Sequence, residues 1–550
     1  MIVLIAGLLL VVFVAASSIH SSRKRKRALI EQLRNGWGKI KSGPFTFEAI
    51  EKYATQSGGN GFHRLSTQTL NDIDFLDLFS FIDRTTSKIG QQFLFNQLLH
   101  PTNDIKALNL FNQRVEMLSK DKDLREEVQK ELLRLSGSDA YFVCSLLKKK
   151  LLERPSWFPL LYVNALIVIV MSILAFSYPI VLIYLLIPIT INMFVHYWNK
   201  SNTFLFLRSF PQLSLLIDIS GRLRQKDLAR DSESIRKSVS SLKPFQFKIG
   251  FLSLSADNTI KDELSQVATY FIELLKAFFV VEVIVLFDLI KDLESKNNDI
   301  SALFEFVGEI DAAISVASLR AGELKTCLPE FTPPMKGASL KKMYHPLIKD
   351  CVKNDLQVDG KSILITGSNM SGKTTFLRTV VINSILAQTI FTCFADEFQS
   401  PILRQFSSIR IDDSLLEGKS YYYEEVNTMG SFVKEVHSPF QNLILLDEVF
   451  KGTNTIERIA AAKAALSYLN KGSNIIIVST HDFELPGMLQ KEYDQYHFSE
   501  SIENDKLHFD HKIKPGPLLA GNAIRLLEMS NYPKEIVSEA RELSVSLSSS

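Results

Sequence analysis

The sequence predicts a parallel α/β domain in the last third of the chain, preceded by a mostly α-helical region with helices long enough to span a membrane. Short apolar runs that end in polar or acidic residues, with helical patterns after them, predict the α/β domain. Two long segments without a charged side chain predict the membrane helices. At 550 residues the chain can hold two or three domains.

The overall composition argues against several kinds of site. The formal net charge is +2, so no global basic field points to nucleic acid. The four cysteines form no Cys-x-x-Cys pair, which argues against a zinc site or a disulfide framework and fits a reducing compartment. They are Cys144, Cys327, Cys351 and Cys393.

The first apolar segment covers residues 1–20 and predicts a transmembrane helix, with a cytoplasmic linker over residues 21–60. A cleaved signal peptide is the alternative, but its charges would precede the apolar run, whereas the basic residues Arg23 to Arg27 follow it. The positive-inside rule then places Met1 outside and the rest inside. The basic run beside a span is expected to meet anionic lipid head groups rather than nucleic acid.

The second apolar segment, residues 157–198, is long enough for two helices and predicts a transmembrane hairpin that turns at Ser177 to Pro179. Lys148 to Lys150 before it and Lys200 after it place both ends on the cytoplasmic side. The alternative is a buried core in a soluble domain. A shorter stretch, residues 277–290, contains two acids and predicts a packed core helix. Aromatic residues of the kind found at membrane interfaces flank the hairpin: Trp157, Tyr178, Tyr197 and Trp198.

A phosphate-binding loop is predicted after a short buried strand at residues 362–366. Residues 367–374 fit the pattern G-x-x-x-x-G-K-[ST], and a helix is expected over residues 375–388. Backbone N–H groups of such a loop hold phosphate oxygens, Lys373 would reach the β- and γ-phosphates, and the Thr374 hydroxyl would bind Mg²⁺. The nucleotide-binding residues expected here are Gly367, Ser368, Asn369, Met370, Ser371, Gly372, Lys373, Thr374 and Thr375.

Two adjacent carboxylates follow another buried strand, residues 443–446, about seventy residues further along the chain. Asp447 would hold the Mg²⁺ shell, and Glu448 would orient the attacking water. A helix-capping acid is the alternative. A third apolar strand ends before His481, which could sense the γ-phosphate or act as a structural hydrogen-bonding group. We therefore expect catalysis from Lys373, Glu448 and His481, and metal binding from Thr374 and Asp447.

These motifs together resemble the MutS family of mismatch-repair ATPases, a branch of the ABC-type fold. "TGSNMSGKTTFLR" is similar to the family's phosphate loop, "LLDEVFKGTNT" to its Walker B segment and "STHDFEL" to its switch histidine segment. "GKSYYYEEVNTM" resembles its signature segment, which implies that Ser420 and Glu425 contact nucleotide held by a second chain; a helix entry with an aromatic cluster is the alternative. Upstream, "TLNDIDFLDLFSFIDRTTSKIGQQFLFNQLLHPTNDIKALNLFNQRVEML" is similar to the family's helical core.

The resemblance implies a MutS-like helical core and lever region at residues 61–335, interrupted by the hairpin, and an ABC-type ATPase domain at residues 336–550. The sequence departs from the family in three ways. Residues 1–60 leave no room for its mismatch-reading domain, Ser371 replaces a usual glycine, and the apolar hairpin lies where relatives carry their DNA clamp.

The resulting expectation is a membrane-anchored MutS-like ATPase that uses ATP and Mg²⁺, forms a homodimer through its ATPase domains and undergoes an ATP-dependent conformational cycle. Its partners would be the lipid bilayer and, as the resemblance implies, DNA. We expect a multi-pass protein of a bacterial plasma or inner membrane, with the ATPase domain in the cytoplasm. The alternatives are an ABC-type ATPase that acts on a membrane partner without recognising mismatches, and a non-catalytic scaffold.

Overall fold

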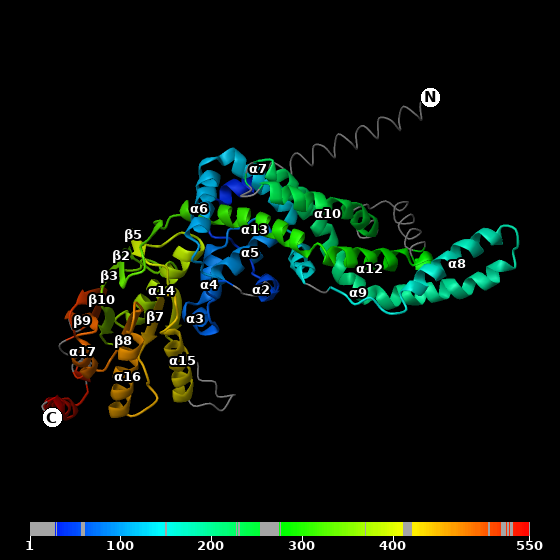
Figure 1. Cartoon of the computed structure of the whole chain (residues 1–550). Coiled ribbons are helices and arrows are strands. Elements are labelled where there is room, and N and C mark those ends of the chain that lie inside the picture. Colours follow the sequence, from blue (N-terminus) through cyan, green and yellow to red (C-terminus); the bar gives the residue numbers. More distant parts are fainter. Residues whose placement is uncertain are drawn as a thin grey trace. The chain divides into compact units, whose positions relative to one another are not determined.

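Figure 1 shows the computed structural model of the chain. It describes residues 28, 30–56, 61–148, 151–226, 228, 232–253, 274, 277–368, 370–410, 421–503, 506–518, 524, 527–528 and 532–548. The chain forms two compact units. The first contains residues 1–58, 83–96 and 113–321, and the second contains residues 59–82, 97–112 and 322–550.

The second unit is built on a six-stranded sheet in the order β10-β9-β4-β8-β7-β6. Neighbouring strands from β9 to β6 run parallel, and β10 pairs antiparallel with β9. The expected strand at residues 362–366 is confirmed, since β4 has the same bounds. The strands are β4 (Ser362–Thr366), β6 (Arg404–Ser408), β7 (Asn442–Asp447), β8 (Ile475–Thr480), β9 (Tyr493–Glu503) and β10 (Lys506–Pro515).

Alternation along the central strands sends side chains into two apolar layers, one on each face of this sheet. Leu364, Ile444 and Ile476 pack with α15 (Tyr421–Glu435), α16 (Thr455–Leu469) and α17 (Glu484–Leu489). The neighbouring residues Leu443 and Ile475 instead contact the residues of α14 (Lys373–Thr389) and of a second sheet. Because both faces are covered, these strands are continuously apolar, as parallel strands usually are.

The second sheet has the strand order β1-β5-β2-β3. Its strands are β1 (Pro329–Phe331), β2 (Gly337–Met343), β3 (Asn354–Asp359) and β5 (Glu397–Ser400). Two short helices from earlier in the sequence, α3 (Thr67–Asp72) and α4 (Phe75–Ile82), belong to the same unit. Asp72 is fully buried and accepts hydrogen bonds from Ser407 Oγ and from the backbone N–H groups of Ile409 and Arg410, which fixes α3 at the end of β6. Helix α19 (Lys534–Ser548) closes the chain.

The first unit is helical, as expected. Two helices, α5 (Lys88–Leu99) and α6 (Ile105–Lys120), have residues in both units. The other helices described in the first unit are α2 (Phe47–Gln56), α7 (Lys122–Leu132), η1 (Leu133–Leu135), η2 (Ser138–Leu147), α8 (Pro159–Ala175), α9 (Val181–Arg224), α10 (Ser232–Ser253), α12 (Val281–Glu294) and α13 (Asn297–Arg320). The expected core helix near residues 277–290 is confirmed as α12, whose Leu286, Leu289 and Ile290 are buried.

The apolar stretch at residues 157–198 forms two helices, α8 and the first part of α9, joined near the expected turn. Asn164 Nδ2 donates to Asn192 Oδ1 at 2.6 Å and to the Pro188 carbonyl at 3.1 Å, so the two helices pack against each other. Among the described residues one helix segment, Val181–Asn199, has the length and apolar composition of a membrane span. α8 is apolar but has 17 residues, so the expectation of two spans is not supported; the expected span at residues 1–20 lies outside the described residues.

Candidate functional site

The predicted phosphate loop, the two carboxylates and the histidine meet at one edge of the six-stranded sheet. β8 lies between β4 and β7, with Thr366 paired to Thr480 and Asp447 paired to Ser479. Since adjacent strands lie about 5 Å apart, the segments that leave β4 and β7 are separated by about 10 Å. The carboxyl edge of a parallel sheet is the usual place for a ligand in such folds.

The loop between β4 and α14 depends on two glycines with positive φ. At Gly367, φ is +151°, and a Cβ would lie 2.8 Å from the Phe498 carbonyl oxygen, so a side chain does not fit. Gly372 has φ +115° and is the N-cap residue of α14. Met370 is also left-handed, with φ 69°, and its side chain is 83% exposed at the tip of the loop. Asn369 lies outside the described residues.

Lys373 is folded back into its own loop. Its Nζ donates to the carbonyl oxygens of Gly367 and Ser368, both at 2.8 Å, and lies 3.3 Å from His481 Nε2. The side chain is 5% exposed, and burial lowers its pKa despite the nearby acids Asp447 and Glu448. A buried ammonium that donates to two neutral carbonyl oxygens would gain from a phosphate dianion, because a hydrogen bond between two charged groups is stronger.

The proposed metal ligands Thr374 and Asp447 are in direct contact. Thr374 Oγ1 donates to Asp447 Oδ2 at 2.6 Å, and Ser479 Oγ donates to the other carboxylate oxygen. Hydroxyl and carboxylate oxygens are the hard ligands that Mg²⁺ takes together with substrate phosphates and water. The described residues contain no group of three or more His, Cys, Asp or Glu side chains that could hold an ion by themselves.

The Glu448 carboxylate and the His481 ring are in direct contact next to Lys373. The Glu448 Oε1 to His481 Nε2 distance is 2.7 Å, and Lys451 Nζ lies 3.1 Å from Glu448 Oε2. Burial alone would raise the pKa of Glu448, but hydrogen bonds and charges from His481 and Lys451 outweigh it and lower the pKa to about 2. Glu448 also has a left-handed backbone, φ 57°, a costly conformation that is often found at functional sites. The carboxylate is therefore ionised and can orient a water molecule by accepting a hydrogen bond.

The Glu425 side chain contacts its own chain, whereas a group that reaches a second chain is expected to lie at the surface. Its side chain is 5% exposed, and its carboxylate accepts from the backbone N–H groups of Lys451 at 3.2 Å and Gly452 at 3.4 Å in the same chain. Gly452 leaves no space for a Cβ, which would lie 2.8 Å from Tyr422 Cβ. α15 therefore holds the loop after β7 in place. Ser420 lies outside the described residues, and contact of either residue with a nucleotide across a dimer stays a prediction.

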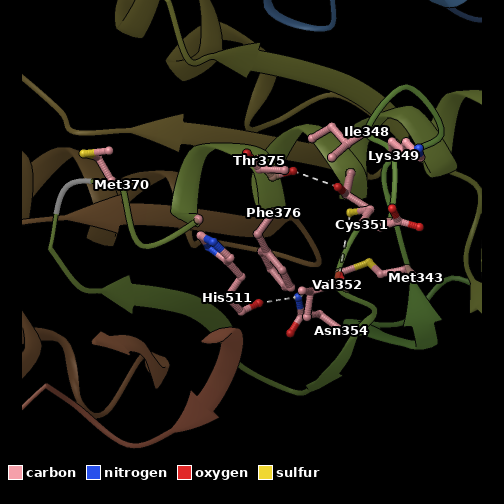
Figure 2. Close-up of a pocket in the computed structure, with 13 residues that line it drawn as sticks. Met343, Ile348, Lys349, Cys351, Val352, Asn354, Met370, Thr375, Phe376 and His511 are labelled. Atoms are coloured by element: carbon pink, nitrogen blue, oxygen red, sulfur yellow. Dashed lines mark hydrogen bonds between the residues drawn. The ribbon is translucent and has the colours of Figure 1, made fainter. Parts of the chain in front are cut away.

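A pocket of about 320 Å³ adjoins the phosphate loop (Figure 2). Figure 2 shows Phe376 and the His511 ring on one side of it and the segment from Ile348 to Asn354 on the other. His511 Nδ1 donates to the Ser371 carbonyl at 3.0 Å, which orients the ring, and Thr375 also lines the pocket. A flat apolar ring system fits a space walled by aliphatic and aromatic groups.

Sequence reasoning missed this second half of the site. His511 comes from β10, about 140 residues after the phosphate loop, and Asn354 holds it there by donating to the His511 carbonyl at 3.0 Å and accepting from Ile513 N–H at 2.9 Å. Glu500, which accepts from Ser368 Oγ at 2.6 Å, was missed as well. No short motif marks these residues, because they reach the loop only through the pairing of β10, β9 and β4.

Residues 363–548, which contain this whole arrangement apart from the pocket segment before β4, match the family description "MutS domain V". Over these residues the chain is similar to the MutS family. It is 35% identical over 265 residues to the DNA mismatch repair protein MutS of Pseudothermotoga lettingae, which covers 46% of this chain and 32% of that protein. Similarity to a Thermus thermophilus protein of the same name is 31% identity over 241 residues, 43% of this chain and 28% of the relative.

The protein of that name from Listeria welshimeri is 34% identical over 219 residues, 37% of this chain and 25% of the relative. The chain thus matches about a quarter to a third of the length of these MutS proteins. The family match lies within the second unit, whose mixed α/β sheets fit MutS domain V.

Proposed function

We propose that the second unit binds ATP with Mg²⁺ and hydrolyses it. The observation that carries this proposal is the meeting of Lys373, the Thr374–Asp447 pair and the Glu448–His481 pair at one sheet edge. The chemistry is divided among them. Lys373 would exchange its carbonyl contacts for phosphate oxygens, and Glu448 would orient a water molecule for attack on the γ-phosphate. His481 contacts both Lys373 and Glu448, so a change at Lys373 on phosphate binding would alter the position of the Glu448 carboxylate through this ring.

Thr374 and Asp447 would hold Mg²⁺, which neutralises phosphate charge when it is bound. The base would enter the pocket between Phe376 and Val352, with the His511 ring at its side. This placement puts a planar base in contact with apolar surface while its phosphates meet the loop.

The test is a comparison of two variants by ATP binding and phosphate release. Glu448→Gln should bind ATP with nearly unchanged affinity and lose hydrolysis by at least about 100-fold, because the variant keeps the metal ligand and loses the carboxylate that orients water. Lys373→Ala should lose binding itself. Wild-type turnover by Glu448→Gln would overturn the catalytic assignment.

A homodimer formed through the second unit is part of the proposal. The phosphate loop is open at Met370, and an isolated site of this kind exposes the transferred phosphate to solvent. Closure by the Ser420 segment of a second chain would exclude water and place further donors near the developing charge. Such closure would couple ATP binding to a conformational cycle.

We also propose attachment to a membrane through α8 and the apolar part of α9. Large apolar side chains cover these helices on the outside: Leu166, Ile173 and Phe176 on α8 and its end are 60%, 64% and 94% exposed. An apolar surface of this extent is unusual for a soluble protein and matches contact with lipid. Labelling from outside intact cells should reach a cysteine placed at the turn residue Ser177 and should fail at an exposed control, Ser431→Cys on α15. Reaction at position 431 alone would contradict this orientation.

We propose that the ATP cycle acts on bound DNA, because the relatives that match the second unit are named DNA mismatch repair proteins. Titration of detergent-solubilised protein with matched, mismatched and branched duplexes at several salt concentrations tests it. Binding that weakens with salt and strengthens or weakens with ATP supports the proposal. Absence of binding to every duplex would favour a membrane partner instead.

A further inference from the structure

Two cysteines far apart in the sequence face each other in the second unit. Cys327 lies in the segment that leads to β1, and Cys393 follows α14, the helix that begins at Lys373. They form an isolated antiparallel bridge and exchange both backbone hydrogen bonds, N to O, at 2.9 Å each. In such a hydrogen-bonded pair the Cα atoms are about 5.5 Å apart. That separation lies in the middle of the range found for disulfides, about 4.4 to 6.8 Å.

The side chains also meet the requirements of a reactive pair. The neighbouring Cys393 thiol is the main reason why the pKa of Cys327 is lowered, with the nearby Lys325 ammonium adding to it. Cys327 is partly exposed, whereas Cys393 is fully buried. Thiols that sense oxidants share this arrangement: an accessible thiol with a low pKa beside a second thiol that can resolve the first product.

We propose that Cys327 and Cys393 are a reversible thiol–disulfide pair that responds to hydroperoxides. The Cys327 thiolate attacks one peroxide oxygen, the O–O bond breaks, and a sulfenic acid forms with release of hydroxide from hydrogen peroxide or of alkoxide from an organic hydroperoxide. The Cys393 thiol then attacks the Cys327 sulfur, the S–O bond breaks, and water leaves with the thiol proton. The two thiols lose two electrons in total, and the peroxide gains them.

The surroundings favour reaction at this pair over reaction at Cys144. Cys393 is held in place because its Sγ donates to the Asn383 carbonyl at 3.6 Å, while Asn383 Oδ1 accepts from the next backbone N–H, that of Phe394, at 2.6 Å. Cys144 belongs to the first unit and is buried, with a raised pKa caused by burial, so it is a poor nucleophile and an internal control. The bridge would tie the segment before β1 to the turn after α14.

The experiment uses the full chain treated with hydrogen peroxide, then alkylated and digested with trypsin without reduction. Cleavage after Lys325, Lys336, Arg378 and Arg404 places the two cysteines in peptides 326–336 and 379–404. Native protein should give these two peptides as one linked species, about 2 Da lighter than their sum, which dithiothreitol separates. Protein unfolded in urea before peroxide addition should lose most of this link, because the pairing is tertiary.

Two variants test the order of the steps. In Cys393→Ala the sulfenic acid on Cys327 has no resolving thiol, so a dimedone adduct should accumulate there. In Cys327→Ala the buried Cys393 should stay reduced. The proposal is overturned if native protein gives no 326–336 to 379–404 link, or if the link forms equally well in native and unfolded protein.

Discussion

Removal of the Glu425 carboxylate should loosen the loop after β7 from within the same chain. Two backbone N–H groups donate to it, at 3.2 and 3.4 Å, from Lys451 and Gly452. These bonds are long and their donors lie at exposed residues, so we assign about 0.5 to 1 kcal/mol to each. Glu425→Ala also removes one buried methylene group, Cγ, which is worth about 0.8 kcal/mol.

Burial acts against these terms, because it raises the pKa of Glu425 and so destabilises the ionised form at neutral pH. Because the pKa of Glu425 is raised in the folded state, the stability contributed by its protonated form is fully present at low pH and is lost as pH rises through the folded pKa. Removal of the buried carboxylate therefore also removes its desolvation penalty, which offsets part of the destabilisation. The net expectation is about 1.5 kcal/mol for Glu425→Ala, which corresponds to a roughly ten-fold larger equilibrium constant for opening of the loop. Glu425→Gln keeps the methylene groups and an acceptor, so it should change opening only a few-fold.

Hydrogen exchange measures this effect directly, since the amides of Lys451 and Gly452 are themselves the donors. Phosphate release should fall in parallel, because Lys451 also contacts Glu448. A mixture of Glu425→Ala with Lys373→Ala separates the two possible roles of Glu425. If Glu425 acts within its own chain, neither composite site of a heterodimer is intact and activity does not recover. Recovery in the mixture, or unchanged exchange in Glu425→Ala, would refute the reasoning.

Three further predictions concern the same site. Gly367→Ala should weaken ATP binding at least about ten-fold in a calorimetric titration, because its Cβ would lie 2.8 Å from the Phe498 carbonyl oxygen. In the control Gly430→Ala the added Cβ meets no atom within 4 Å, so this variant should bind ATP normally. The pKa of Glu448 is lowered to about 2 from an ordinary 4.5, so its ionised form contributes stability above about pH 4.5 that is lost as pH falls toward 2. Glu448→Gln should therefore reduce the pH dependence of the free energy of urea unfolding by about 1 to 2 kcal/mol over that interval, after allowance for solvent screening. An unchanged pH dependence would contradict the ionic contacts of Glu448. Ser420→Arg should block ATP-dependent dimerisation measured by light scattering, and its mixture with Lys373→Ala should regain part of the phosphate release, unlike the Glu425→Ala mixture.

The sequence by itself determined the phosphate loop, the strand that precedes it and the acids at the end of β7. These features are local: a loop that binds phosphate needs glycines at fixed spacing, and a strand buried on both faces needs a continuous apolar run. The helical character of the first unit followed for the same reason. Length and composition also indicated an apolar hairpin, although one of its two helices proved shorter than a span.

Only the tertiary structure decided which distant groups complete the site. Strand order places β8 between β4 and β7, so His481 contacts both Lys373 and Glu448. It also brings His511 from β10 to the pocket and turns Glu425 inward. The Cys327–Cys393 pair has the same origin, since residues so far apart in the sequence meet only after the sheets and α14 have packed. Local patterns record what each segment needs for itself, whereas these contacts depend on long-range pairing that no single segment encodes.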